Sequence, residues 1–254
     1  MKYALKDFKP DKAASAVVDW LKQQLIISGT NGYVLGLSGG VDSAVTLMLL
    51  NRAAPGCVIP VFLDGGNSRE DREDAEACAA AAGVNLKYMD LAGFRDNIFK
   101  AAVEESDDKK SKESAIVRGN LCARLRMSVL YTIGNYHNYL VSGTDNADEL
   151  FTGYFTKYGD GAVDVLPLAP FVKGEVYALG EYLKVPPSVL QKPPSAGFFP
   201  GQTDEEEMGI SYEVIDAYLR GETVDGKAEE IIEKLHRQSE HKRNLPVKMP
   251  DIKL

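Results

Sequence analysis

The chain has 254 residues and a formal net charge of -8 at pH 7. This length can bury the core of one α/β domain, and the acidic balance disfavours a general nucleic-acid-binding protein. An anionic ligand must therefore be held by local cations or metal rather than by the overall field. The chain shows no signal-peptide stretch at its start, no run long enough to span a bilayer and no CxxC pair among its three cysteines. We expect a reduced, cytoplasmic protein with no membrane partner.

Hydrophobic periodicity predicts helices that alternate with short apolar strands. The first elements are an amphipathic helix over 11–27, a strand over 33–37 and a buried helix over 41–53. The alternation continues with strands over 58–63, 84–91 and 139–142, a short fifth strand over 163–166, helices over 69–82, 116–136, 211–220 and 226–238, and a tail from 241. This order is typical of an α/β fold with a doubly wound parallel sheet flanked by helices, and we expect one domain over 1–254.

The stretch LGLSGGVDSAV, residues 35–45, joins the first strand to the buried helix. Its paired glycines let the backbone come close to a ligand, and the free N–H groups at the helix start suit phosphate. Ser38 and Ser43 add hydroxyl donors, and Asp42 could hold a divalent metal beside that phosphate. Neither the lysine of the P-loop nor the GxGxxG spacing is present. The stretch therefore indicates another kind of phosphate loop, with an ordinary serine-capped turn as the alternative.

Polar, glycine-bearing loops follow three of the predicted strands: LSGGVDS, LDGGNS and VSGTDN. The carboxyl ends of parallel strands meet at one edge of a sheet, where ligands bind in such folds. The last loop opens the acid-rich stretch 143–168, which could bring two carboxylates onto Mg²⁺ or could be a solvated surface loop. Later in the chain, the proline- and glycine-rich stretch 193–209 indicates a lid over the substrate, with an inert linker as the alternative.

SGGVDS resembles the pyrophosphatase loop of the N-type ATP pyrophosphatases, which split ATP between its α- and β-phosphates. Four later groups of motifs resemble the NAD synthetase family and follow its order up to residue 243: GNLCARLRM; GTDNADELFTGYFTKYGDG with DVLPL; KPPSAG with GQTDEEEMG; and HKR. The resemblance implies an adenine nucleotide alpha hydrolase-like fold and the ATP-dependent amidation of deamido-NAD by ammonia to NAD. AMP and pyrophosphate would be released through an adenylated intermediate.

The resemblance also implies ligands for individual positions. Mg²⁺ would be held by Asp42 and Glu149, and the catalytic residues would be Asp42, Asp164 and Lys173. ATP would be bound by the phosphate loop and three later residues: Gly36, Leu37, Ser38, Gly39, Gly40, Val41, Asp42, Ser43, Thr144, Lys173 and Ser195. Deamido-NAD would be contacted by Arg124, Lys157, Asp164, His241 and Lys242. A role for Asp164 in accepting a proton from ammonia is a hypothesis prompted by the acidic residues around it.

Some of these positions have simpler interpretations. Lys173 could only begin a helix, Ser195 could be a turn residue, and HKR could be a solvated tail. Arg118 and Arg126 compete with Arg124 for its role, because periodicity does not choose among them. The family further implies a homodimer whose interface includes the RGNLCARLRM helix and holds deamido-NAD.

The length leaves no room for a glutamine-hydrolysing domain, so we expect free ammonia as the direct nitrogen donor, although a partner glutaminase subunit is conceivable. Two rival functions stay open on the residues alone. One is a different N-type ATP pyrophosphatase, such as a GMP synthetase-like or tRNA-thiolating enzyme. The other is a nucleotide-binding module without turnover, as in electron-transfer flavoprotein-like folds.

Overall fold

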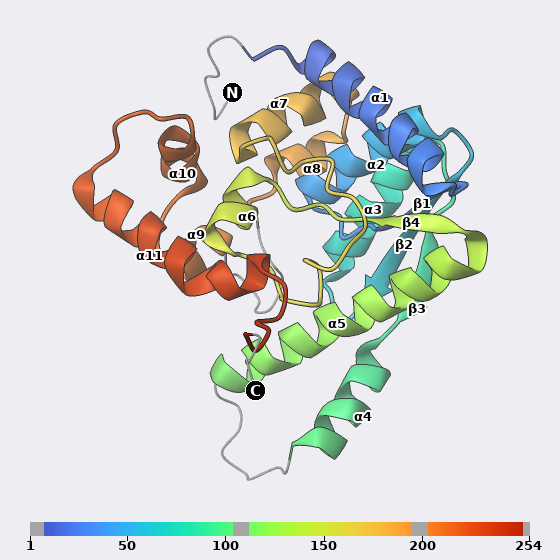
Figure 1. Ribbon diagram of the computed structural model, residues 1–254. Helices are drawn as coiled ribbons and strands as arrows, with labels where there is room; N and C mark the ends of the chain where they lie inside the picture. The colour runs from blue at the N-terminus through green and yellow to red at the C-terminus, as the bar shows by residue number, and fades with distance from the viewer. Residues whose placement is uncertain (1–7, 104–111, 195–202, 251–254) are drawn as a thin grey trace.

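A parallel β-sheet forms the centre of the protein (Figure 1). The computed structural model describes residues 8–103, 112–194 and 203–250. Within these residues the sheet has four strands in the order β3–β2–β1–β4, and all neighbouring strands are parallel. The strands are β1 (Gly32–Gly36), β2 (Val58–Asp64), β3 (Lys87–Asp90) and β4 (Tyr139–Ser142).

Helices connect the strands and continue beyond the last one. α1 (Pro10–Ser28) precedes β1, and those between the strands are α2 (Val41–Ala53), α3 (Arg69–Ala82), α4 (Ala92–Ala102) and α5 (Lys112–His137). Those after β4 are α6 (Ala147–Thr152), α7 (Lys173–Leu183), α8 (Pro187–Gln191), α9 (Asp204–Met208), α10 (Tyr212–Leu219) and α11 (Gly226–Arg243).

The two faces of the sheet pack against different helices. Tyr33 and Leu35 of β1 join a core cluster with α1, α2, α3 and α7, whereas Val34 joins a second cluster with Leu130 of α5. This follows from the period of two along a strand, which sends neighbouring side chains to opposite faces. Figure 1 shows α5 as the long helix on its own side of the sheet. The prediction of a doubly wound α/β fold is confirmed.

A third hydrophobic cluster lies apart from the sheet. Tyr212 and Ile215 of α10 and Ile232 of α11 are completely buried there, and Phe151 of α6 packs against them. Figure 1 shows α9, α10 and α11 together on one side of the molecule, with α6 between them and the sheet. The short helix α6 therefore connects this cluster to the strand ends.

The order of the strands places a switch point at the carboxyl ends of β1 and β4. β1 pairs with β2 on one side and with β4 on the other, so the chain reverses its direction of winding at β1. Leu35 pairs with Ser142, which brings the segment after Gly36 beside the segment that starts at Gly143. Open α/β sheets bind ligands at such a switch point.

The structure corrects two of the predicted strands. The third strand covers only Lys87–Asp90 instead of 84–91, because the Val84 N–H bonds back to Ala79 O at the end of α3. The expected fifth strand over 163–166 is reduced to one parallel bridge between Val165 and Ser142. Pro167 follows immediately, has no N–H to extend the pairing, and begins a turn.

The structure also corrects the C-terminal prediction. The last helix continues to Arg243 instead of ending near 238, so HKR lies in α11 and not in a tail. It continues because Lys242 and Arg243 donate hydrogen bonds to backbone carbonyls at the end of α6 and just beyond it. The predicted lid over 193–209 includes 195–202, which lie outside the described residues, and its described end forms α9.

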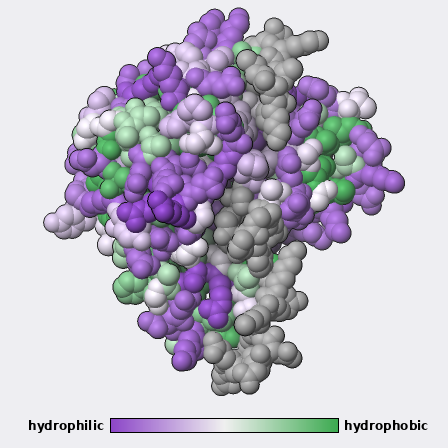
Figure 2. Space-filling model, turned by 180° about the vertical axis from the view of Figure 1, so that it is seen from behind, coloured by the Kyte–Doolittle hydropathy of each residue, from purple (hydrophilic) through white to green (hydrophobic). Residues whose placement is uncertain are grey.

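Hydrophilic side chains cover most of the face shown in Figure 2, and hydrophobic ones gather in a few separate patches. One of these patches lies on the side of the molecule where Figure 1 places α10 and α11. In the part of the chain that the structure describes, no helix combines the length and the apolar character that a membrane span requires.

Candidate functional site

The loop between β1 and α2 is held in one conformation by its own serines. The Ser38 N–H donates to Ser43 Oγ at 3.2 Å, Ser43 Oγ donates to Gly40 O at 3.0 Å, and the Gly40 N–H donates to Ser38 Oγ at 3.2 Å. Gly39 has a φ of +86°, and a Cβ there would lie 2.3 Å from Asp71 O. Only glycine fits this position. The loop is therefore pre-formed at the start of α2, as phosphate binding requires.

Lys173 lies between the segments that meet at the switch point and is 1% exposed. Its ammonium donates to Asp42 Oδ2 at 2.7 Å and to Glu149 Oε1 at 3.2 Å, and it lies 4.6 Å from the centroid of the Tyr212 ring. Burial lowers the pKa of this ammonium, but the charges of Asp42 and Glu149 outweigh it and raise the pKa well above its usual value. Lys173 therefore carries a fixed positive charge beside the phosphate loop.

Local structure at the start of α6 aims Glu149 at this lysine. Asn146 and Glu149 form a capping box, in which each side chain accepts the backbone N–H of the other. Glu149 Oε2 serves this cap, which leaves Oε1 facing Lys173. Burial raises the pKa of Glu149 to about 7, with Lys173 opposing the shift and Asp42 adding to it. Asn146 also donates to Asp42 Oδ1 at 2.9 Å, so both oxygens of Asp42 are bound.

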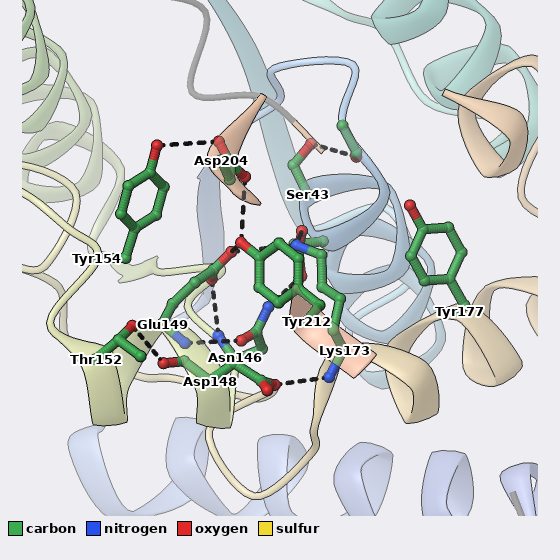
Figure 3. Close-up of polar contacts among 12 residues, drawn as sticks. Ser43, Asn146, Asp148, Glu149, Thr152, Tyr154, Lys173, Tyr177, Asp204 and Tyr212 are labelled. Carbon is green, nitrogen blue, oxygen red and sulfur yellow. Dashed lines mark hydrogen bonds and ion pairs between the residues drawn. The ribbon is translucent and has the colours of Figure 1, made fainter. Parts of the chain in front are cut away.

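A layer of buried polar side chains surrounds this cluster (Figure 3). Tyr212 donates to Asp204 Oδ2 at 3.1 Å and contacts Glu149 Oε1 at 3.4 Å. Asp148 Oδ2 accepts the Lys173 backbone N–H at 2.7 Å, and Asp216 Oδ2 accepts the Gly174 N–H at 2.8 Å. Burial, together with the neighbouring charge of Asp216, raises the pKa of Asp148 to about 9. At neutral pH these two carboxyls therefore share a proton.

The predicted dinucleotide contacts form a second group. Arg124 of α5 donates to Lys157 O at 3.3 Å, and the Lys157 ammonium donates to His241 O near the end of α11. Lys242 donates to Gly153 O and Phe155 O, both at 2.7 Å. The structure thus brings Arg124, Lys157 and the end of α11 from three regions of the chain together through bonds to backbone carbonyls, and three of the side chains involved are cationic.

Asp164, which was also predicted to contact deamido-NAD, forms its side-chain hydrogen bonds with α5 and β4 instead of with this group. Its Oδ1 accepts the Tyr131 hydroxyl at 3.1 Å, and its Oδ2 accepts the Val141 N–H at 2.8 Å. Both oxygens thereby hold α5 to the end of β4. Thr144 follows β4 at the same edge and is partly buried. Ser195 lies outside the described residues.

The sequence interpretation missed several residues of the site. Asn146, Asp148, Asp204, Tyr212 and Asp216 were given no role, yet each touches Asp42, Glu149 or Lys173 or lies one contact away. The density of acids in the stretch 143–168 was a signal that could have pointed to Asp148. The structure shows that this carboxylate is 1% exposed, so it does not serve surface solvation. Asp216 gave no such signal, since it reads as an ordinary polar position on an amphipathic helix.

The described residues do not contain a ready-made metal centre of many ligands. Across 8–103, 112–194 and 203–250, no group of three or more His, Cys, Asp or Glu side chains is arranged to hold a metal ion. Asp42 and Glu149 fit Mg²⁺ by ligand type and number, because Mg²⁺ binds through one or two carboxylates, with water and phosphate oxygens completing its shell.

These features define the class of protein. A doubly wound parallel sheet, a pre-formed loop of glycines and serines at its switch point and a charged lysine between two acids are typical of an α/β enzyme that acts on a nucleoside triphosphate. Residues 13–246 match the model of the NAD synthase family, and the chain belongs to that family. This membership confirms the resemblance given by the motifs, and with it a ligase that forms NAD by ATP-dependent amidation of deamido-NAD.

Individual relatives agree over nearly the whole chain. The NH(3)-dependent NAD(+) synthetase of Alkaliphilus metalliredigens is 50% identical over 236 residues, which are 91% of this chain and 94% of that protein. The structure of NMN synthetase from Francisella tularensis is 38% identical with a TM-score of 0.89, covering 97% of this chain and 100% of that one. The NH3-dependent NAD synthetase from Campylobacter jejuni is 28% identical with a TM-score of 0.78, covering 96% and 100%.

Proposed function

We propose that this site joins ammonia to the nicotinate carboxylate of deamido-NAD, with ATP as co-substrate and free ammonia as the direct nitrogen donor. The observation that carries the residue-level proposal is the buried ammonium of Lys173 between Asp42 and Glu149, next to the 36–43 loop. A pre-formed loop and a fixed positive charge at one point suit a reaction whose leaving group is a polyanion.

The reaction has two steps. In the first, an oxygen of the nicotinate carboxylate bonds to the α-phosphorus of ATP, and the bond from that phosphorus to the pyrophosphate oxygen breaks. In the second, ammonia bonds to the activated carbonyl carbon, AMP leaves with the bridging oxygen, and the nitrogen loses a proton. Lys173 and the loop N–H groups stabilise the negative charge that develops on the phosphates, mainly by electrostatics.

The remaining predicted residues receive roles in the same proposal. Asp42 and Glu149 hold Mg²⁺, which when bound neutralises phosphate charge. Thr144 and Ser195 contact ATP. The deamido-NAD contacts come from the second group of predicted residues described above and from one further acid: Arg124, Lys157, His241, Lys242 and Asp164. The two hydrogen bonds of Asp164 support an orienting role at least as well as the proton-accepting role.

The first test is product stoichiometry. The purified protein is incubated with ATP, Mg²⁺, deamido-NAD and ammonium, and AMP and NAD are measured together. We expect equal amounts of both products, and loss of both in Asp42→Ala. AMP without NAD would support the proposed cleavage of ATP but contradict deamido-NAD as the acceptor. Replacing ammonium by glutamine tests the nitrogen donor, since the chain alone should then form no NAD.

A second acceptor is favoured by one specific observation. The structure with which this chain shares 38% identity and a TM-score of 0.89 is an NMN synthetase. The acceptor that corresponds to it is nicotinate mononucleotide, which has the same carboxylate but lacks the adenylate half. Comparing kcat/KM for the two acceptors under identical conditions decides between them. If kcat/KM is more than ten times higher for nicotinate mononucleotide than for deamido-NAD, the mononucleotide is the main substrate.

We also propose that the chain acts as a cytoplasmic homodimer of single-domain subunits, and that the 193–209 stretch covers the substrate. Apolar side chains on α4 and α5 support the dimer, since Phe94, Ile98 and Val117 are all substantially exposed. Light scattering coupled to size-exclusion chromatography tests this, with Val117→Asp as the interface variant. A wild-type mass near 27.7 kDa would contradict the dimer.

A further inference from the structure

The first turn of α7 is held by acids from two other helices. The backbone N–H of Lys173 donates to Asp148 of α6, and that of Gly174 donates to Asp216 of α10, at 2.7 and 2.8 Å. Both carboxyl groups are essentially inaccessible to solvent. These contacts join residues that are 25 and 42 positions apart, so they are tertiary contacts rather than a local cap.

The start of this helix needs partners from outside. The first N–H groups of a helix lack intrahelical acceptors, and they are usually satisfied by the side chain of the residue before the helix. Here that residue is Val172, which has no side-chain acceptor. Burying a carboxyl group is costly unless it is hydrogen-bonded, and each of these two acids accepts a backbone N–H of α7. What they hold is the backbone from which the Lys173 side chain begins.

Asp216 is the more informative of the two. Asp148 lies next to Glu149 of the α6 capping box, so its replacement changes the immediate surroundings of the site. Asp216 comes from α10, which packs in the third hydrophobic cluster, and it is paired at 3.2 Å with Arg220, the C-cap residue of that helix. Its hydrogen bond to Gly174 thus connects the C-terminal helices to the first turn of α7.

We propose that Asp216 is a positioning residue of the reaction, which sets the ammonium of Lys173 between Asp42 and Glu149 by holding the start of α7. This inference rests on the proposed function. A displacement of the helix start moves the lysine side chain with it, and misplacing a catalytic group by about 1 Å can cost about 100-fold in rate. Asp216 is not itself a catalytic residue, because it acts through Gly174 and Lys173.

The test compares three replacements of Asp216 with one control on the same helix. Asp216→Ala removes the acceptor, Asp216→Glu moves it along by one methylene, and Asp216→Asn keeps an oxygen for the Gly174 N–H and offers an amide donor to Asp148. The control is Tyr218→Phe, which removes the hydroxyl contact from α10 to Glu233 of α11 without touching α7. For each variant, kcat, the KM for ATP and for deamido-NAD, and Tm are measured.

We expect Asp216→Ala and Asp216→Glu to lower kcat at least 10-fold while the KM for ATP changes less than threefold. Asp216→Asn should recover most of kcat, and Tyr218→Phe should lower Tm without lowering kcat. If kcat follows Tm across all four variants, or if Asp216→Glu keeps the wild-type kcat, Asp216 has only a structural role and the inference is overturned. Wild-type protein that forms no AMP or NAD would instead overturn the proposed function.

Discussion

The ammonium of Lys173 lies 2.7 Å from Asp42 Oδ2, although the two residues are 131 positions apart in the chain. The distance arises because Asp42 follows β1 and Lys173 begins a helix that packs on α2 in the same core cluster. A second acid, Glu149, comes from α6, which follows β4, the strand that pairs with β1 on the side opposite β2. The charge balance of the site therefore depends on three separate segments that meet at the switch point of the sheet.

The first prediction concerns this charge balance. Lys173→Met keeps the length of the side chain but leaves two acids facing each other without a cation. We expect kcat to fall by about 100- to 1,000-fold, the range found when one group that stabilises transition-state charge is removed. Lys22→Met is the control, because it breaks an exposed ion pair with Asp19 on α1 and should leave kcat unchanged. Equal activity of the two variants would remove Lys173 from the chemistry.

The second prediction concerns the phosphate loop. Gly39→Ala would place a Cβ 2.3 Å from Asp71 O at a φ of +86°, so the loop must shift. Gly29→Ala is a matched control, because its φ is +66° and no atom lies within 4 Å of the added Cβ. Both should lose about 1–2 kcal/mol of unfolding free energy from the left-handed backbone. Only Gly39→Ala should lose more than this and also raise the KM for ATP.

These outcomes are measured by urea unfolding and by steady-state kinetics. If the two alanine variants have the same unfolding free energy and the same KM for ATP, the close approach of Gly39 to α3 does not shape the loop.

The sequence was sufficient for features that are encoded locally. The short aliphatic run predicted β1, the longer apolar run predicted α2, and the glycine-rich turn between them pointed to phosphate with Asp42 beside it. The structure confirms this arrangement of strand, loop and helix. Glu149 was indicated by its place after a strand end, at the same sheet edge as Asp42, as well as by the family resemblance. Lys173 was assigned only through the resemblance, because nothing in the local pattern distinguishes it from other lysines.

The rest of the site was not predictable because its contacts are non-local or use the backbone. The partner of Asp216 is an amide N–H, which carries no side-chain signature in the sequence. Tyr212 reads as the apolar start of an amphipathic helix, although its hydroxyl reaches Asp204 and Glu149. Likewise, the end of α11 was placed too early because its last turn is stabilised by carbonyls from the α6 region, far away in sequence.

The third prediction tests the contact between α6 and the end of α11. Gly153 and Gly209 both end short helices with nearly the same φ, +70° and +73°. A Cβ at Gly153 would lie 2.1 Å from the Cβ of Ser239 on α11, whereas nothing lies within 4 Å at Gly209. We expect Gly153→Ala to displace α11 and with it Lys242, so that the KM for deamido-NAD rises at least threefold. Gly209→Ala should leave this KM unchanged, and an equal effect of both would exclude the steric explanation.

The fourth prediction concerns pH. The pKa of Asp148 is raised to about 9 in the folded protein, whereas an unfolded aspartate has a pKa of about 3.9. Between these values the folded state therefore holds a proton that the unfolded state has released. The free energy of unfolding must then fall as pH rises through this window, with a limiting slope of about 1.4 kcal/mol per pH unit for one proton. Because Asp216 shares this proton, the effect belongs to the pair.

Asp148→Asn removes this dependence, since the amide donates to Asp216 without a titrating proton and its oxygen still accepts the Lys173 N–H. Urea unfolding at pH 6, 7 and 8 without Mg²⁺ should show the variant gaining stability relative to wild type as pH rises. Asp216→Asn should flatten the wild-type dependence in the same way, because either amide replaces the shared proton. Parallel stability curves for all three proteins would mean that both carboxyls are already ionised at pH 6.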